Sequence, residues 1–202
     1  MSRQGILFVI SAPSGAGKTS LCRAIIDFFP DLRQSISFTT RPIRGGEQDG
    51  VDYHFVSRPS FEAMVAEGAF AEWAEVHGNL YGTALATLES CRDQGLDVLL
   101  DIDCQGAAQL RRSYSGGVFI FVLPPSLEEL RRRLEGRQTD RPEVIERRIA
   151  NARTEIDAAV DYDYLIINQV FPQAVENLKA IMLAERSRTA RVLPTLPQLF
   201  SL

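Results

Sequence analysis

The chain has 202 residues, of which 45% are hydrophobic and 24% charged, a composition typical of one globular unit with a sizeable core. Its formal net charge of −4 at pH 7 argues against broad binding of nucleic acid or membrane surfaces and favours small-molecule partners. The three widely spaced cysteines indicate reduced thiols. We find neither a signal peptide nor an apolar run of the ~20 residues that span a membrane, so we expect a cytoplasmic protein.

The first predicted element is a strand over residues 5–10, which runs directly into a glycine-rich turn and a helix over 18–29. Such a turn can form a nest of backbone N–H groups for phosphate oxygens, and the helix N-terminus adds further donors. In the phosphate-loop pattern G-x-x-x-x-G-K-[ST], the lysine reaches the β and γ phosphates and the next hydroxyl ligates Mg²⁺. The turn matches except that Ala12 replaces the first glycine, and the strand and helix around it favour an ATP site over a simple connection. The predicted ATP-binding residues here are Ala12, Pro13, Ser14, Gly15, Ala16, Gly17, Lys18, Thr19 and Ser20.

After this helix the pattern changes to short β-like pieces, which predict a small α+β insertion over residues 35–83. Helices and apolar strands then alternate, which predicts a parallel sheet covered by helices on both faces. Within the insertion we expect strands over 35–39, 52–56 and 70–76 and a helix over 59–67. Beyond it we expect strands over 97–102, 117–123 and 164–168 and helices over 84–92, 105–112, 126–134, 142–156 and 172–188.

A second anion site is predicted where Arg41 and Arg44 lie three residues apart beside several hydroxyl side chains. A planar guanidinium donates hydrogen bonds in pairs to phosphate oxygens. The alternative is a solvated basic turn, because arginine pairs at protein surfaces are common. In a protein that binds ATP, the natural occupant of a second anion site is the phosphate of an acceptor nucleotide.

Motifs along nearly the whole chain, from about residue 6 to 188, resemble those of the guanylate kinases, P-loop nucleoside monophosphate kinases that transfer phosphate from ATP to GMP. They stand in the order and spacing of that family. Besides the phosphate loop they are Thr39-Thr40-Arg41-Pro42-x-Arg44-x-Gly46-Glu47, Asp52-Tyr53-x-Phe55, Phe70-x-Glu72-Trp73-Ala74, Tyr81-Gly82-Thr83, Leu100-Asp101-Ile102-Asp103-x-Gln105-Gly106, Gly136-Arg137-x-Thr139-Asp140 and Tyr162-Asp163-Tyr164.

The resemblance implies an α/β fold in which a P-loop NTPase-type parallel sheet is flanked by helices and carries an inserted α+β acceptor-nucleotide-binding region and a short helical lid. It implies a single domain, 1–202, with a core of 1–34, 84–125 and 149–202, a GMP-binding insertion of 35–83 and a lid of 126–148. The implied activity is ATP-dependent phosphorylation of GMP, and of dGMP, in purine metabolism, with Mg²⁺ as cofactor.

The resemblance also implies roles for residues in the insertion and beside it. Glu72 and Thr83 match guanine contacts, and a carboxylate suits guanine because it accepts from N1–H and the exocyclic amine together. Without the resemblance, a glutamate on a strand is more often an exposed polar residue. Asp103 would face the acceptor or act as the N-cap of the following helix. The implied GMP-binding set is Ser37, Arg41, Arg44, Tyr53, Glu72, Tyr81, Thr83 and Asp103.

On the ATP side, the resemblance places Asp101 with Thr19 at the Mg²⁺ ion and Asn168 at the nucleotide. Arg131, Arg132 and Arg133 are interpreted as solvated or paired with nearby glutamates, and Arg141 stays an ambiguous lid candidate. His54 and His77 receive no catalytic role. The residues implied to neutralise the transferring phosphoryl group are Lys18, Arg41, Arg137 and Arg148.

Two other functions stay open beside the kinase. One is a catalytically inactive guanylate-kinase-like module that binds a phosphopeptide, against which the intact Lys18 and Thr19 argue. The other is a P-loop kinase that acts on a phosphorylated sugar, whereas Glu72, Tyr81 and Thr83 favour guanine. The sequence leaves open a homo-oligomer and the role of residues 192–202.

Overall fold

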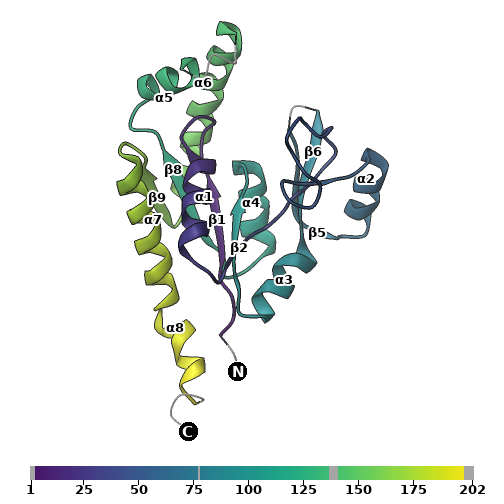
Figure 1. Cartoon of the computed structure of the whole chain (residues 1–202), viewed down its shortest axis with the longest axis vertical. Coiled ribbons are helices and arrows are strands. Elements are labelled where there is room, and N and C mark those ends of the chain that lie inside the picture. The colour runs from purple at the N-terminus through teal and green to yellow at the C-terminus, as the bar shows by residue number, and fades with distance from the viewer. Residues whose placement is uncertain (1–2, 77, 137–140, 198–202) are drawn as a thin grey trace.

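The structure, a computed structural model, describes residues 3–76, 78–136 and 141–197 and has the predicted α/β architecture (Figure 1). Its centre is a five-stranded sheet in the order β2-β7-β1-β8-β9, and each neighbouring pair is parallel. The strands are β1 Leu7–Ser11, β2 Leu32–Gln34, β7 Asp97–Asp101, β8 Val118–Leu123 and β9 Tyr164–Ile167.

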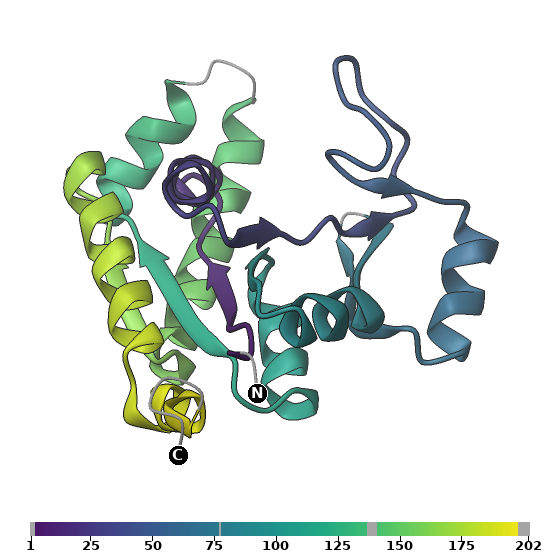
Figure 2. The ribbon, with the colours of Figure 1, turned by 60° about the horizontal axis from the view of Figure 1, so that its bottom comes forward.

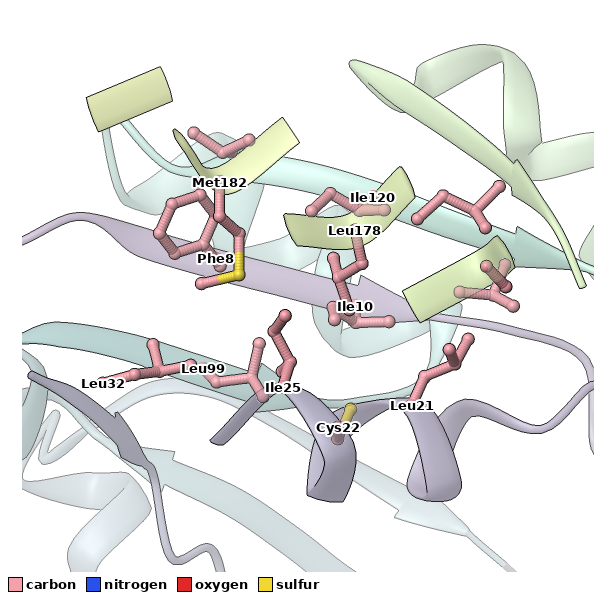
Figure 3. Packing of buried hydrophobic residues seen from close by; sticks show 14 of the residues in the cluster. Phe8, Ile10, Leu21, Cys22, Ile25, Leu32, Leu99, Ile120, Leu178 and Met182 are labelled. Atoms are coloured by element: carbon pink, nitrogen blue, oxygen red, sulfur yellow. The ribbon is translucent and has the colours of Figure 1, made fainter. Parts of the chain in front are cut away.

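Helices cover both faces of this sheet, which explains why its central strands read as continuous apolar runs. On one face, Phe8 and Ile10 of β1 pack with α1 and α7, as Figure 3 shows for Ile25 and Met182. On the other face, Leu7 and Val9 pack with α3 and α4. The helices are α1 Lys18–Phe28, α3 Leu85–Asp93, α4 Cys104–Ser113 and α7 Phe171–Arg186.

The predicted insertion forms a second sheet, in the order β4-β3-β6-β5, which lies to one side of the first together with α2 (Figures 1 and 2). Its antiparallel pair β5/β6 places Glu72 opposite Thr83. The sheet is held against α4, because the Trp73 N–H donates to Gln109 Oε1 at 3.2 Å. The elements are β3 Phe38–Thr39, β4 His54–Phe55, α2 Arg58–Ala66, β5 Phe70–Val76 and β6 Asn79–Ala84.

Two helices, α5 Leu127–Glu135 and α6 Pro142–Asp157, lie near the carboxyl end of the parallel sheet. They share a small apolar cluster that includes Leu130 and Ile149. At the start of α5, the Ser126 hydroxyl accepts the Glu129 N–H at 3.0 Å, as the capping pattern predicts. Helix α6 continues unbroken past residue 149, so the boundary that the sequence places after residue 148 lies inside a helix.

Four features of the fold lie beyond the sequence predictions, and one of them is strand β6, which pairs with β3 and β5. Strand β2 has one buried residue, Leu32, and its pairing with β7 rather than a local pattern makes it a strand. A 3-10 turn, Ala158–Asp161, follows α6, and a short helix, α8 Thr189–Val192, with a 3-10 turn, Leu193–Thr195, follows α7. Within the described ranges, no helix has the length and apolar character needed to cross a bilayer.

Candidate active site

The glycine-rich turn after β1 has the backbone of a phosphate loop. Gly15 and Gly17 have φ angles of 97° and 98°, in the left-handed region that glycine adopts at little cost. The Ala16 N–H donates to the Pro13 carbonyl at 3.0 Å, which closes the turn. Gly17 is the N-cap of α1 and makes no side-chain cap, so the first N–H groups of the helix are offered to an anion.

Lys18, Thr19 and Asp101 meet at the carboxyl ends of two adjacent strands, because Ile10 of β1 is paired in register with Asp101 of β7. The Lys18 ammonium forms an ion pair with the Asp101 carboxylate and donates to the Ile102 carbonyl at 2.9 Å. The Thr19 hydroxyl donates to the second Asp101 oxygen at 3.5 Å. The sequence-predicted lysine, hydroxyl and carboxylate are therefore brought together.

The oxygen set at this point fits Mg²⁺, which binds hard oxygen ligands and relies on one or two protein groups together with substrate phosphates. Thr19 and Asp101 supply one hydroxyl and one carboxylate side by side. Among the described residues, no group of three or more His, Cys, Asp or Glu side chains could form a protein-only metal cage. The arrangement suits a metal that arrives with a nucleotide.

A cavity of about 560 Å³ opens over the phosphate loop. Of the nine predicted loop residues, all but Ala16 line it. Ala16 is fully buried, and its carbonyl accepts a hydrogen bond from the Asn168 side-chain amide at 2.8 Å. Asn168 is 4% exposed and is not among the lining residues, so the structure places it behind the loop, which it supports. The other lining residues are Glu75, Val76, Asp103, Gln105, Asn151 and Glu155.

Two of these lining residues, Asn151 and Glu155, come from α6 and were missed by the sequence analysis. Glu155 is half-buried and accepts a hydrogen bond from the Ser14 N–H of the phosphate loop. Its burial, and next its proximity to Asp103, raise the pKa of this carboxyl. With Arg148, these two residues have the spacing i, i+3, i+7, which places all three on one side of the helix. This spacing in the sequence indicates that Asn151 and Glu155 share a helix face with Arg148, so it could have identified both residues as site candidates.

A second, smaller pocket of about 170 Å³ lies between the insertion and the parallel sheet. The Glu72 carboxylate faces it and is only 5% exposed. Thr83 is fully buried and donates its hydroxyl hydrogen to Glu72 Oε1 at 2.5 Å, so Thr83 orients the carboxylate rather than lining the pocket. Six of the predicted residues line it: Ser37, Tyr53, Glu72, Tyr81, Asp101 and Asp103.

The Glu72 carboxyl is held in an environment that disfavours its charge. Burial raises the pKa of Glu72 from 4.5 to about 7; the Thr83 hydroxyl opposes this rise and the nearby Asp103 carboxylate adds to it. The N-cap interpretation of Asp103 is confirmed, because Asp103 Oδ1 accepts the Gly106 N–H at 2.8 Å at the start of α4. Asp103 also lines both cavities, and its role toward the acceptor stays a prediction. Glu72 is therefore poised to change charge near neutral pH.

Of the two predicted phosphate-binding arginines, Arg41 is ordered and Arg44 is exposed. Arg41 is 8% exposed and forms a bidentate pair with Glu47 at 3.0 and 2.8 Å, which raises the pKa of the guanidinium. It also lies 5.4 Å from the centre of the Tyr53 ring. The interpretation of a merely solvated turn is thus wrong for Arg41. Neither arginine lines the two cavities described above, and the Arg44 N–H donates to Glu47 at 2.8 Å.

The remaining arginines of this region divide into ion-paired and candidate groups. Arg132 and Arg133 pair with Glu129, as expected, whereas Arg131 pairs with Glu146 of α6. Arg148 is half-buried on α6. The predicted Arg137 lies outside the described residues, as does His77.

Comparisons with known proteins agree on one family. The family model described as "Guanylate kinase" matches residues 4–185. The guanylate kinase of Syntrophotalea carbinolica is 67% identical over 202 residues, which cover all of this chain and 96% of the relative, and that of Geobacter metallireducens is 58% identical over the whole of both chains. The crystal structure of guanylate kinase from Anaplasma phagocytophilum matches with a TM-score of 0.77 and 33% identity, covering 100% of this chain and 98% of that one.

Proposed function

Because the chain belongs to the guanylate kinase family, we propose that it transfers the γ-phosphoryl group of ATP to GMP, with ADP and GDP as products. The observation that carries this proposal is the junction of the two cavities, since Val76 and Asp103 line both the large polar cavity over the phosphate loop and the small pocket that ends at Glu72. A donor and an acceptor nucleotide would thus have their phosphates directed toward a shared wall.

In this proposal Glu72 selects the base. Guanine offers N1–H and an exocyclic amine as adjacent donors, and a buried carboxylate can accept both, whereas adenine has no hydrogen at N1. Desolvation by the enclosing pocket makes an unmatched donor or acceptor costly, so a base of the wrong pattern is rejected. Thr83 contributes by holding the Glu72 carboxylate in one orientation.

The acceptor phosphate would be bound by the ordered Arg41 together with Ser37, Tyr53 and Tyr81, and by Arg44. Glu47 fixes the position of the Arg41 guanidinium before the acceptor arrives. Such preorganisation reduces the conformational entropy lost on binding. dGMP is expected to be an acceptor as well, because no residue assigned here requires the ribose 2′-hydroxyl.

The donor phosphates would lie on the N–H groups of the phosphate loop, with the Lys18 ammonium neutralising their charge. Thr19 and Asp101 would hold Mg²⁺, which would supply further positive charge at the phosphate oxygens. Arg148 lies on the side of α6 that carries the cavity-lining Asn151 and Glu155, and in this proposal it would add a second cationic contact. Arg137 is proposed for the same task from the family motif alone.

The chemical step needs placement and charge neutralisation more than proton transfer. A nucleotide phosphate is already ionised near neutral pH, so its oxygen can attack the γ-phosphorus in line without a strong general base. Lys18, Arg41 and Arg148 then stabilise charge that spreads over the transferring group. Exclusion of water once both nucleotides are bound would limit hydrolysis of ATP.

The test is an acceptor panel in which ADP release is measured with ATP, Mg²⁺ and each of GMP, dGMP, AMP, UMP and ribose 5-phosphate. We expect kcat/KM for GMP to exceed that for AMP and UMP by at least ~10²-fold. Turnover only with the sugar phosphate would support a sugar-phosphate kinase, and no turnover with any acceptor, from protein that binds ATP, would support a non-catalytic binding module. Either result would overturn the proposal.

A further inference from the structure

Gly106 is a buried residue in the first turn of helix α4, which is an unusual place for a glycine. Glycine in a helix is less favourable than alanine, because it loses more backbone entropy on folding. Its backbone N–H donates to the capping Asp103 Oδ1 at 2.8 Å, a bond that the N–H of any residue other than proline could make. Its φ angle is not in the left-handed region that favours glycine. Helix formation alone therefore gives no reason for glycine at this position.

The reason is the side chain that lies against Gly106. A Cβ atom built on this residue would stand 2.5 Å from Glu72 Oε2 and 3.2 Å from Glu72 Cδ. The first distance is shorter than any real carbon contact, so a methyl group at residue 106 and the Glu72 carboxylate cannot both keep their places. The backbone of α4 thus forms the wall behind the carboxylate.

Glu72 has little freedom to yield. Its other carboxylate oxygen, Oε1, accepts the Thr83 hydroxyl at 2.5 Å, and the residue is 5% exposed. A displaced carboxylate would either lose the Thr83 hydrogen bond or move into the 170 Å³ pocket that it lines. Both outcomes change the pattern of acceptors that the pocket presents to a base.

We propose that Gly106 is a positioning residue that determines base specificity, because the missing side chain lets the Glu72 carboxylate lie at the back of the base pocket. The proposal rests on the proposed role of Glu72 in guanine recognition. Gly106 itself lines neither the base pocket nor the phosphate-loop cavity, so its effect passes through Glu72. The donor nucleotide is not involved.

The test is a double-mutant cycle of Gly106→Ala and Glu72→Asp, read out as kcat/KM for GMP and AMP, KM for ATP, and Tm. We expect Gly106→Ala to lower kcat/KM for GMP by roughly 10-fold or more and that for AMP by less than about 3-fold, with KM for ATP changed less than about 2-fold. The matched control is Ala108→Val, which adds bulk to the exposed side of the same helix and should leave all three values within about 2-fold.

The cycle identifies the partner of the added methyl group. Aspartate is one methylene shorter, so in the Glu72→Asp background the Gly106→Ala change should cost less than about 3-fold with GMP and should raise Tm relative to the single Gly106→Ala variant. This Tm comparison remains decisive if Gly106→Ala alone folds poorly. Fully multiplicative effects on kcat/KM with no recovery of Tm, or equal losses for GMP and AMP, would overturn the proposal.

The single variants separate the two proposals. If Glu72→Asp changes the GMP-to-AMP ratio and Gly106→Ala does not, Gly106 is a packing glycine and the role of Glu72 stands. If Glu72→Asp leaves the ratio unchanged, the assignment of guanine recognition to Glu72 fails, and the specificity role of Gly106 fails with it.

Discussion

Replacing Glu72 by glutamine is expected to stabilise the protein at alkaline pH while making it a poorer and less selective kinase. The substitution keeps the shape of the side chain and an oxygen that can accept the Thr83 hydroxyl, but it removes a charge from a site that is 5% exposed. Burial raises the pKa of Glu72 from 4.5 to about 7, so the folded state holds a proton that the unfolded state releases.

The sign and size of the stability effect follow from this shift. The favourable contribution of protonated Glu72 is complete below about pH 4.5 and is lost as the pH rises through about 7, which amounts to roughly 3 kcal/mol. Because glutamine does not ionise, the difference in the free energy of unfolding between the variant and the wild type should grow by that amount from pH 4.5 to pH 8. Urea denaturation at several pH values measures it. A difference that does not change with pH would refute the buried-carboxylate reasoning.

The same variant tests base selection. One guanine N–H would face the amide donor of glutamine, so kcat/KM for GMP should fall roughly 10-fold or more while AMP loses less or gains. In the wild type, kcat/KM for GMP should rise as the pH increases through about 7, because Glu72 ionises. The variant should lack this rise but keep the pH dependence of kcat/KM that comes from ionisation of the substrate phosphate. If the GMP-to-AMP ratio is unchanged, guanine specificity is carried elsewhere, and Thr83 and Asp103 are the next positions to test.

Three further substitutions test other parts of the molecule. Lys18→Ala should lower kcat by roughly 10²-fold or more with an unchanged far-UV spectrum, because Lys18 lines the cavity over the phosphate loop and is not part of the apolar core. Wild-type turnover from the folded variant would rule out the loop assignment. Arg44→Ala should weaken GMP binding roughly 10-fold in calorimetry and leave ATP binding unchanged, whereas equal losses for both nucleotides would contradict its placement at the acceptor. Asp97→Asn should lower the free energy of unfolding by about 3 kcal/mol, because the fully buried Asp97 carboxylate pairs with Arg186 at 2.6 Å and accepts the Ile6 N–H at 2.8 Å. Activity per folded molecule should not change. An activity loss without a stability loss would contradict this structural role.

The parts of the fold that could be predicted are those set by local pattern. The phosphate loop combines glycine positions, a preceding buried strand and a following amphipathic helix, and the structure has all three features in place. Strand β5 was predicted with its observed bounds, and the N-cap role of Asp103 follows from a short-range hydrogen bond. Strand β2 was not predictable, because its three residues have only Leu32 buried and depend on β7 for pairing.

The parts of the site that escaped prediction depend on contacts between distant segments. Glu155 reaches the phosphate loop only because α6 folds back toward Ser14. Arg131 pairs with Glu146 across two helices instead of with a neighbour on its own helix. The family motif includes Gly106, but its contact with Glu72, 34 positions earlier, appears only when β5 lies against α4.

The most direct test of the central claim is to follow the γ-phosphoryl group itself. ATP labelled with ³²P at the γ position is incubated with the protein, Mg²⁺ and GMP, and the nucleotides are separated. The account predicts that the label moves into GDP in step with ADP formation and that Lys18→Ala blocks the transfer. Label that appears as inorganic phosphate, or remains in ATP while GMP is unchanged, would contradict direct transfer from ATP to GMP.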